Sequence, residues 1–151
     1  MPSSTRVNAR LDAGVPRLQS CVVNEAYRQT VFLVEASEVA WPEEFAVITA
    51  CNPDGRTVGE RENAARTGLM LEHLSARGAV VARVEGCSPD LVHCEPGFAA
   101  RLSLQEAVTL GRQFEQEAVF HVRAGVLSLV SCEDGRSVVL GAWRDRLARR
   151  P

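Results

Sequence analysis

The sequence predicts an α/β or α+β fold in which a mixed β-sheet of five to six strands carries two main helices. Three observations support this prediction. Short runs rich in β-branched and aromatic residues recur along the chain, which is the usual composition of strands. Two longer stretches carry apolar residues at helical spacing. The length of 151 residues suits a single domain, which at this size buries roughly 68–70% of the surface of its unfolded chain.

The chain divides into three segments in this prediction. Residues 1–22 are polar and without hydrophobic period, so we expect a flexible N-terminal arm. Residues 23–143 form a single α/β domain. Residues 144–151 form a basic C-terminal tail.

Two strands precede the first helix. Residues 27–35 are rich in β-branched and aromatic side chains. Residues 45–50, with the sequence FAVITA, form a short and nearly continuous apolar run, which is typical of a strand buried on both faces. Residues 36–44 join the two strands.

A helix and a third strand follow. Residues 57–77 carry apolar side chains at helical spacing, and Thr57 with Glu60 has the spacing of a capping box at the helix start. Residues 79–86 form the next apolar run. Because a strand, a helix and a strand in succession usually form a crossover, we expect 45–50 and 79–86 to be a parallel pair.

The second helix has the clearer start signal. A short strand at residues 97–102 leads into a helix at 103–115, where Ser103 and Glu106 have capping-box spacing. Apolar side chains recur on one face of this helix. The sequence therefore predicts a second helix that packs on the sheet.

A hairpin follows the second helix. Residues 117–122 and 127–132 have the composition of strands, and the Ala124-Gly125 pair between them indicates a tight turn. Two interpretations of residues 138–151 stay open. They form a last edge strand or short helix that docks Trp143 with its Arg side chains in water, or they form a tail that binds a partner.

Charge and composition exclude several functions. All 17 basic residues are Arg, because the sequence contains no Lys. A Schiff-base lysine, a lysine general base and a phosphate-loop lysine are therefore excluded. The net charge of -2 gives no general attraction for nucleic acid or for an anionic membrane, so we expect neither partner.

The number and spacing of the cysteines, together with hydropathy, predict where in the cell the protein is located. Five cysteines, an odd number without a CxxC pair, indicate a chain without disulfides in a reducing compartment. The first residues lack the apolar run of a signal peptide, and nowhere do about 18 apolar residues run together. We therefore expect a cytoplasmic protein.

The strong catalytic and cofactor motifs are absent. The sequence contains no GxxxxGK[ST], GxGxxG, HExxH or GxSxG motif. Nucleotide hydrolysis by a P-loop, zincin chemistry and a hydrolase elbow are therefore disfavoured. The sequence predicts no cofactor and no metal, and it identifies no catalytic residue.

The loop after the buried strand is the first candidate site. Ligands of open α/β sheets gather beyond the carboxyl ends of the strands. This loop and the next helical turns carry amide and guanidinium groups that suit the carboxylate or phosphate of a small ligand: Asn52, Arg56, Arg61 and Asn63. Against this, Glu60 and Glu62 already occupy the positive end of the helix, and residues 52–55 form a good turn on structural grounds alone.

Glu95 joins this site under one condition. It stands just before the strand at 97–102. If that strand runs antiparallel to 45–50, Glu95 lies at the same edge of the sheet as Asn52 and Asn63. A carboxylate that faces two amides and an Arg is a candidate acid/base cluster.

Two cysteine arrangements have a functional interpretation and a simpler one as packing. Cys51 ends the buried strand, and with His93 or His121 it would make a thiol nucleophile on paper, but such a cysteine is usually a small buried apolar residue. Cys87, His93 and Cys94 offer three soft ligands in one loop. Their spacing matches no zinc pattern, and a fourth ligand is missing.

An ordered series of motifs resembles a known family. The motifs are FAVITACNP, ENAAR with a leucine-bearing helix, EPGFAA, SLQEAVTLGRQFEQEAVF and LSLVSC, within about residues 27–132. They are similar to the bacterial proteins of unknown function grouped as DUF3293. Matching positions include Asn52, Asn63, residues 95–98 and Gln116, whereas Cys51 stands where an aromatic residue is frequent. The resemblance implies a compact α/β domain in a bacterial cytoplasm, and it supplies no activity.

Two functions stay open. One is a small-ligand site, in an enzyme or a binding protein, built from Asn52, Arg56, Arg61, Asn63 and Glu95. The other is a non-catalytic interaction module that uses an exposed edge strand or the tail with its Arg residues and Trp143. A concave polar pocket that joins the Asn52 loop to Glu95 favours the first function, and a flat apolar patch or an open edge strand favours the second.

Overall fold

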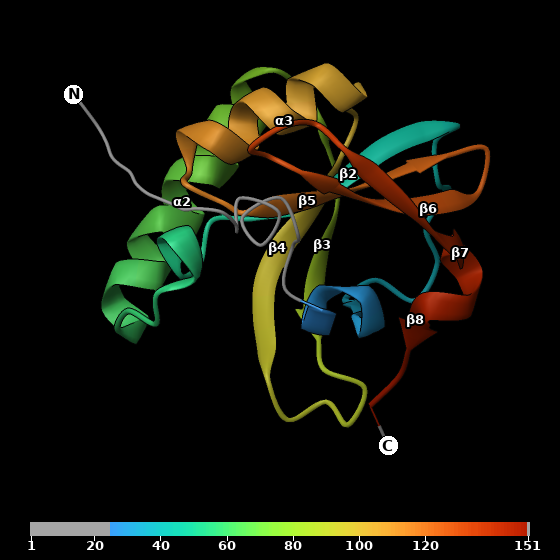
Figure 1. Ribbon diagram of the computed structural model, residues 1–151, viewed down its shortest axis with the longest axis horizontal. Helices are drawn as coiled ribbons and strands as arrows, with labels where there is room; N and C mark the ends of the chain where they lie inside the picture. Colours follow the sequence, from blue (N-terminus) through green and yellow to red (C-terminus); the bar gives the residue numbers. More distant parts are fainter. Residues whose placement is uncertain (1–24, 151) are drawn as a thin grey trace, which may run out of the picture.

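The computed structural model describes residues 25–150, so the arm predicted at residues 1–22 lies outside the described residues. Within this range two α-helices lie on a curled mixed sheet of eight strands (Figure 1). The α+β class with two main helices is therefore confirmed. The predicted number of five to six strands was wrong, because residues 137–148 add two further strands at opposite edges of the sheet.

The elements follow one another along the chain with short connections. In order they are η2 (Glu25–Gln29), β1 (Val31–Val34), β2 (Glu44–Thr49), η3 (Pro53–Gly55), α2 (Glu60–Ala76), β3 (Val80–Cys87), β4 (Cys94–Ala100), α3 (Leu104–Gln113), β5 (Ala118–Arg123), β6 (Val126–Ser131), β7 (Ser137–Ala142), η4 (Trp143–Arg146) and β8 (Leu147–Ala148). The strand order across the sheet is β7-β6-β5-β2-β4-β3-β1-β8.

The expected parallel pair does not form. Strand β4 lies between β2 and β3 and runs antiparallel to both of them. The hairpin of β3 and β4 returns the chain at once, so β4 takes the place beside β2 that the crossover prediction gave to β3. Among the strands described, only β1 and β8 pair in parallel.

Helix α2 begins later than the sequence predicts. Its N-cap is Gly59, which makes no side-chain cap hydrogen bond, so the capping box of Thr57 and Glu60 is not formed. Val58, just before the helix, bonds the preceding loop: its main-chain N–H donates to the side-chain oxygen of Asn52 at 3.1 Å. The backbone is extended at Gly59, and the helix begins at Glu60.

Helix α3 and the hairpin after it agree with the prediction. The side chain of Ser103 accepts from the N–H of Glu106, and the Glu106 carboxylate accepts from the N–H of Ser103. Strands β5 and β6 pair antiparallel around Ala124 and Gly125, which both have positive φ. The predicted strand at 27–35 is shorter, because its first residues form η2.

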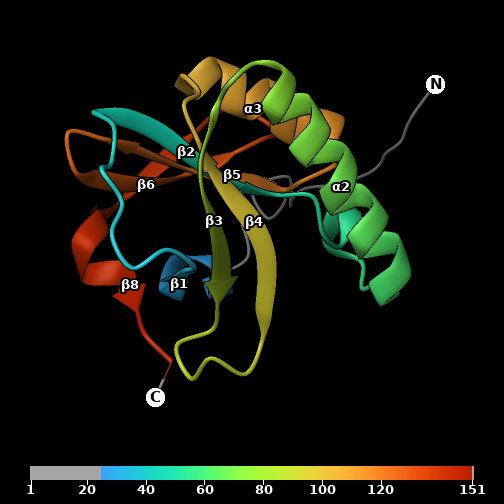
Figure 2. The same ribbon diagram turned by 180° about the vertical axis from the view of Figure 1, so that it is seen from behind.

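Strand β2 is buried on both faces, as its apolar run predicts. Ala46 and Ile48 pack on the helix side of the sheet, with Met70 of α2 and residues of α3. Phe45 and Val47 pack on the opposite side with β1, β3 and Trp143. Both helices lie on the same side of the sheet (Figure 2), where α2 covers β3 and β4 and α3 covers β2 and β5.

The C-terminal residues are part of the domain. Trp143 is buried in η4, with its ring 4.9 Å from that of Phe32 and 5.3 Å from that of Phe45. This agrees with the docked interpretation of the tail. Arg146 is not in water as that interpretation expected, since its guanidinium donates to three main-chain carbonyls.

Two of the five cysteines form a disulfide, which contradicts the prediction of a chain without disulfides. Cys87 and Cys94 lie directly opposite each other where β3 and β4 are joined, and their sulfurs are bonded. Spacing along the sequence did not reveal this pair, because it depends on the register of the hairpin. The cysteine count therefore gives no support for a reducing compartment.

Candidate functional site

Three of the predicted site residues meet at one edge of the sheet. Asn52 follows β2 with φ of 51°, and its side-chain NH₂ donates to Oε2 of Glu95 at 2.7 Å. The side-chain NH₂ of Asn63 donates to Oδ1 of Asn52 at 3.0 Å, and Oδ1 of Asn63 accepts from the main-chain N–H of Asn52 at 2.9 Å. Each amide thus holds the other, and Asn52 holds the carboxylate.

Strand direction brings these residues together. The antiparallel register of β2 and β4 places Thr49 opposite Gly97, so the end of β2 and the start of β4 share an edge. The condition set for Glu95 is therefore met. Helix α2 starts beside this edge, and its first turn supplies Asn63.

Side-chain hydrogen bonds from Arg66 and Gln116 hold the Asn52 loop in place. Arg66 of α2 donates from Nε to the carbonyl of Ala50 at 2.6 Å and also bonds the carbonyl of Phe114. Gln116 donates from its side chain to the carbonyl of Cys51 at 3.0 Å. These contacts fix the loop between α2 and the end of α3, and so they fix the position of Asn52.

Burial dominates the electrostatics of the cluster. Desolvation raises the pKa of the half-buried Glu95 carboxyl, and the hydrogen bond from Asn52 only partly offsets it. Tyr27 of η2 lies nearby, with its hydroxyl 3.5 Å from Oε1 of Glu117. Its burial, together with the charges of Glu117 and Glu95, raises the pKa of Tyr27 to about 12. The cluster is therefore an acceptor-rich site.

The two predicted arginines do not join this cluster. Arg56 and Arg61 are exposed, and within residues 25–150 neither has a hydrogen bond or ion pair to the amides or to Glu95. Tyr27 and Glu117 stand near Glu95 in their place. Sequence reasoning missed both of them. The only signal near them was the resemblance noted at Gln116.

The cysteine alternatives find no support in the geometry. Cys51 is buried beside Thr67, whereas His121 bonds Glu44 at 2.8 Å instead of a thiol. One possible ligand atom each from Glu85, Cys87 and Cys94 lie within 4.8 Å of one another. Both of these sulfurs are bonded in the disulfide, so neither is a free thiolate for a metal.

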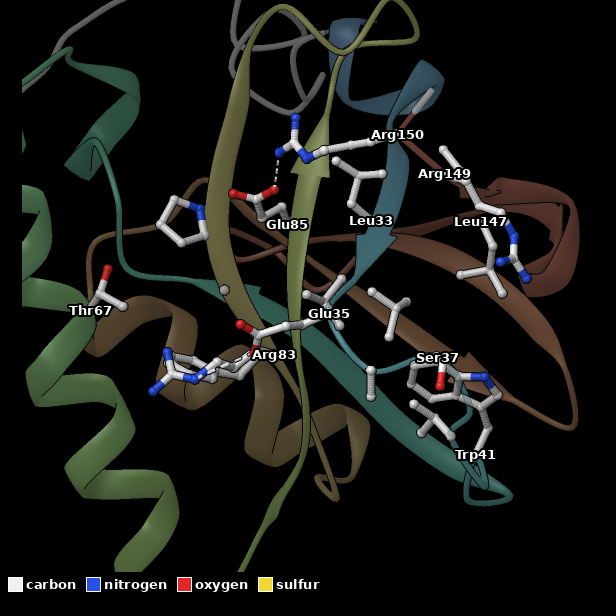
Figure 3. Close-up of a pocket in the computed structure, with 18 residues that line it drawn as sticks. Leu33, Glu35, Ser37, Trp41, Thr67, Arg83, Glu85, Leu147, Arg149 and Arg150 are labelled. Carbon is white, nitrogen blue, oxygen red and sulfur yellow. Dashed lines mark hydrogen bonds and ion pairs between the residues drawn. The ribbon is translucent and has the colours of Figure 1, made fainter.

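A pocket of about 760 Å³ lies elsewhere, between β1, β3, β4 and β8 (Figure 3). It reaches Pro96 and Gly97, the neighbours of Glu95, but neither Asn52 nor Glu95 lines it. The Glu95 cluster, by which we mean Tyr27, Asn52, Asn63, Glu95 and Glu117, is therefore a separate feature of the molecule.

Fold and cluster together define a small α+β domain with a carboxylate held by two amides at one edge of its sheet. A family model described as "Protein of unknown function (DUF3293)" matches residues 48–119, which supports the resemblance of the sequence motifs to that family. No curated protein and no solved structure matches the chain. The matched segment includes Asn52, Asn63 and Glu95, while Tyr27 lies outside it.

Proposed function

We propose that the protein binds a small polar ligand at the Glu95 cluster. The observation that carries this proposal is the state of Glu95: one carboxylate oxygen accepts from Asn52, and no described residue donates a hydrogen bond to the other. Glu95 is not among the fully buried side-chain polar atoms without a partner in residues 25–150, so this oxygen is open to solvent and accessible to a ligand. A ligand with N–H or O–H groups would donate to it.

The amides orient the carboxylate and do not themselves recognise the ligand. Asn52 and Asn63 use their polar atoms on each other, on Val58 and on Glu95. Glu117 adds a second carboxylate next to Tyr27. Two carboxylates repel an anion, so the polar alternative of the predicted ligand is better supported than the anionic one.

A thermal-shift screen of the purified chain against small amines, amides and nucleosides tests this proposal. A ligand at 100 times its dissociation constant adds about 2.7 kcal/mol to stability. We expect hits whose shift disappears in Glu95→Gln and Asn63→Ala but persists in Glu62→Gln, a matched change of an exposed glutamate in the same helix turn as Asn63. A folded protein that responds to no donor-bearing compound, or hits that survive Glu95→Gln, would contradict the proposal.

A second candidate function rests on β7. This strand is at one end of the sheet order, and Val139 on it is 68% exposed. An open edge strand with apolar side chains is a template for strand addition by another chain. The alternative that uses the tail has less support, because Trp143 is buried.

Strand addition at β7 predicts a loss of partner capture in Val139→Lys, which charges the edge without touching the core. Glu133→Lys, an exposed change in the turn before β7, is the matched control. Equal capture by the parent protein and by Val139→Lys would exclude this edge.

Location stays a prediction. No helix in residues 25–150 is long and apolar enough to cross a membrane. The bacterial cytoplasm is proposed from the family resemblance. Trapping the free thiols in growing cells, followed by mass analysis of Cys87 and Cys94, tests it, since a reducing compartment leaves both cysteines open to alkylation.

A further inference from the structure

The sheet has an uncovered part on its helix side. The helices pack on β2, β3, β4 and β5, and β1 and β8 continue the sheet beyond β3. The pocket of about 760 Å³ begins at this place, with Thr67 of α2 at its border, and extends to Val39 and Trp41, which pack with the core on the opposite side of the sheet. Figure 3 shows Thr67 and Arg83 on one side of the pocket and Trp41, Leu147 and Arg149 on the other. Its size lies within the roughly 300–1,000 Å³ of ordinary small-molecule sites.

The pocket has an apolar floor and wall. Leu33 of β1 and Phe98 of β4 line it from the sheet, Leu147 lines it from β8, and Trp41 lines it from the segment between β1 and β2. Arg83 lies over the Phe98 ring, with its guanidinium carbon 5.6 Å from the ring centroid. Phe98 is 1% exposed and Leu33 is 7% exposed, so Trp41 and Leu147 supply the accessible apolar surface for the hydrocarbon part of a ligand.

Charge in the pocket favours an anion. Three arginines line it, Arg83, Arg149 and Arg150, against two glutamates, Glu35 and Glu85. Glu85 pairs with Arg150 at 2.6 Å, and Glu35 pairs with Arg83 at 3.9 Å. Among the described residues, Arg149 has neither an ion pair nor a hydrogen bond from its side chain, so it is the unneutralised cation of the pocket.

The existing pairs leave room for a ligand carboxylate. The pair of Arg83 and Glu35 is long and its side chains are 55% and 74% exposed, so it contributes little to stability. A carboxylate that binds Arg149 meets a planar guanidinium with free donors, which is the geometry for two parallel hydrogen bonds. The pocket therefore combines the guanidinium of Arg149, which can bind a charged head group, with an apolar surface that can bind a tail.

We propose that this pocket is a second binding site, which takes an amphipathic carboxylate with its head group at Arg149 and its apolar body against Trp41 and Leu147. The site is independent of the Glu95 cluster. Strands β1 and β8, which form one side of it, lie outside the segment matched by the family model.

Decanoate is the probe, with decanol and decyltrimethylammonium as ligands of the same tail and different head charge, each below the concentration at which it aggregates. Binding is followed by calorimetry and by tryptophan fluorescence, because Trp41 lines the pocket and the only other tryptophan, Trp143, is buried. We expect decanoate to bind more tightly than both other ligands. We expect the fluorescence change to be lost in Trp41→Phe, and calorimetry to show weaker decanoate binding in Trp41→Ala, since Trp41 is part of the apolar surface.

Arg149→Gln should weaken decanoate binding roughly three- to tenfold, the range between an exposed ion pair and a charge-assisted hydrogen bond. Arg144→Gln, an exposed arginine of the same segment outside the pocket, should leave binding unchanged. Unfolding midpoints of both variants show that they are folded. Glu95→Gln should also bind decanoate normally, so this test and that of the Glu95 cluster fail separately.

Three results would overturn the second site. Absence of decanoate binding to the folded parent protein would do so. Equal binding of decanoate and decanol would show an apolar cavity without a head-group site. Unchanged affinity in Arg149→Gln would remove Arg149 from it.

Discussion

At the scale of single residues, two opposing effects act on the pKa of Glu95. Burial favours the neutral carboxyl, and the hydrogen bond from Asn52 favours the carboxylate. Burial is the larger effect, so the pKa is raised. The folded protein therefore binds this proton more tightly than the unfolded chain does.

This difference predicts a pH dependence with a definite sign. Stabilisation from protonated Glu95 is complete below the ordinary pKa of 4.5 and is lost as the pH rises through the raised pKa of the folded state. Glu95→Gln does not titrate, so it should gain stability relative to the parent protein as the pH rises from below 4.5, and the gain should level off above the folded pKa. Urea unfolding at a series of acidic to neutral pH values measures it.

Glu106→Gln is the control of opposite sign. The N–H of Ser103 lowers the pKa of Glu106, so the stability it contributes is present above 4.5 and is lost as the pH falls. Its variant should lose stability relative to the parent protein as the pH rises. Two variants whose pH curves change in the same direction would show that Glu95 is not governed by burial.

Members of the Glu95 cluster could be predicted from the sequence where they are close along the chain or at neighbouring strand ends. Asn52 and Asn63 are close in sequence, and Glu95 needed only the direction of one strand. Tyr27 and Glu117 stand 90 positions apart, and no local pattern indicates that they meet. Arg56 and Arg61 were wrong as members of the cluster, because a loop position does not say where a long side chain points.

At the scale of elements, the two helices differ at their N-termini. The capping box is formed at the start of α3, whereas the one that the sequence suggests at Thr57, before α2, is not formed. Ser103→Ala removes a capping box that is present, and it should lower the free energy of unfolding by about 1 kcal/mol. Thr57→Ala alters a capping-box sequence that the structure does not use, and its effect should be within about 0.5 kcal/mol. Chemical denaturation measures both. Equal losses would mean that Thr57 caps α2 after all.

The approach of β4 to β2 depends on a missing side chain. A Cβ on Gly97 would lie 2.5 Å from the carbonyl oxygen of Ile48, a main-chain atom of the neighbouring strand. Gly97→Ala should therefore cost roughly 1–3 kcal/mol of stability. Gly68→Ala is the matched control: this glycine is exposed within α2 with no atom near its Cβ position, so the change should stabilise by about 0.5–1 kcal/mol. A stabilising Gly97→Ala would contradict the close approach.

Elements were predictable in kind and less so in their ends. Apolar periodicity identified β2, α3 and the hairpin of β5 and β6. The start of α2 was wrong because the backbone is extended at Arg56 and at the N-cap Gly59, and the N–H of Val58 donates to the side chain of Asn52. The sequence pattern of a capping box does not reveal this extended segment.

At the scale of the whole molecule, Arg146 joins distant parts of the sheet. Its guanidinium donates to the carbonyls of Arg28, Thr30 and Leu140, and so it connects η2 and the start of β1 with β7. Arg146→Ala should lower the free energy of unfolding by roughly 2 kcal/mol, because it leaves these carbonyls without their donor. Arg144→Ala, on the exposed side of the same turn, should change it by less than about 0.5 kcal/mol. Similar unfolding curves for the two variants would refute this role.

Strand order was the part of the fold that could not be predicted. Composition indicates which segments are strands but not their order. In β4, which lies between β2 and β3, Ala99 and Ala100 are buried and Gly97 closely approaches Ile48 of β2. The same placement brings Glu95 to Asn52. The candidate site and the unpredicted topology therefore have one cause.

The bond between Cys87 and Cys94 has a consequence for how the molecule responds to a cut chain. It closes the exposed tip at residues 88–93 into a small ring. A protease that nicks the backbone at Leu91 opens this ring without releasing a fragment, because the disulfide still joins the two chain segments. Reduction then removes that covalent link, and the segments are held together by the shared core and by the pairing of β3 with β4, β2 with β4 and β5, and β1 with β8.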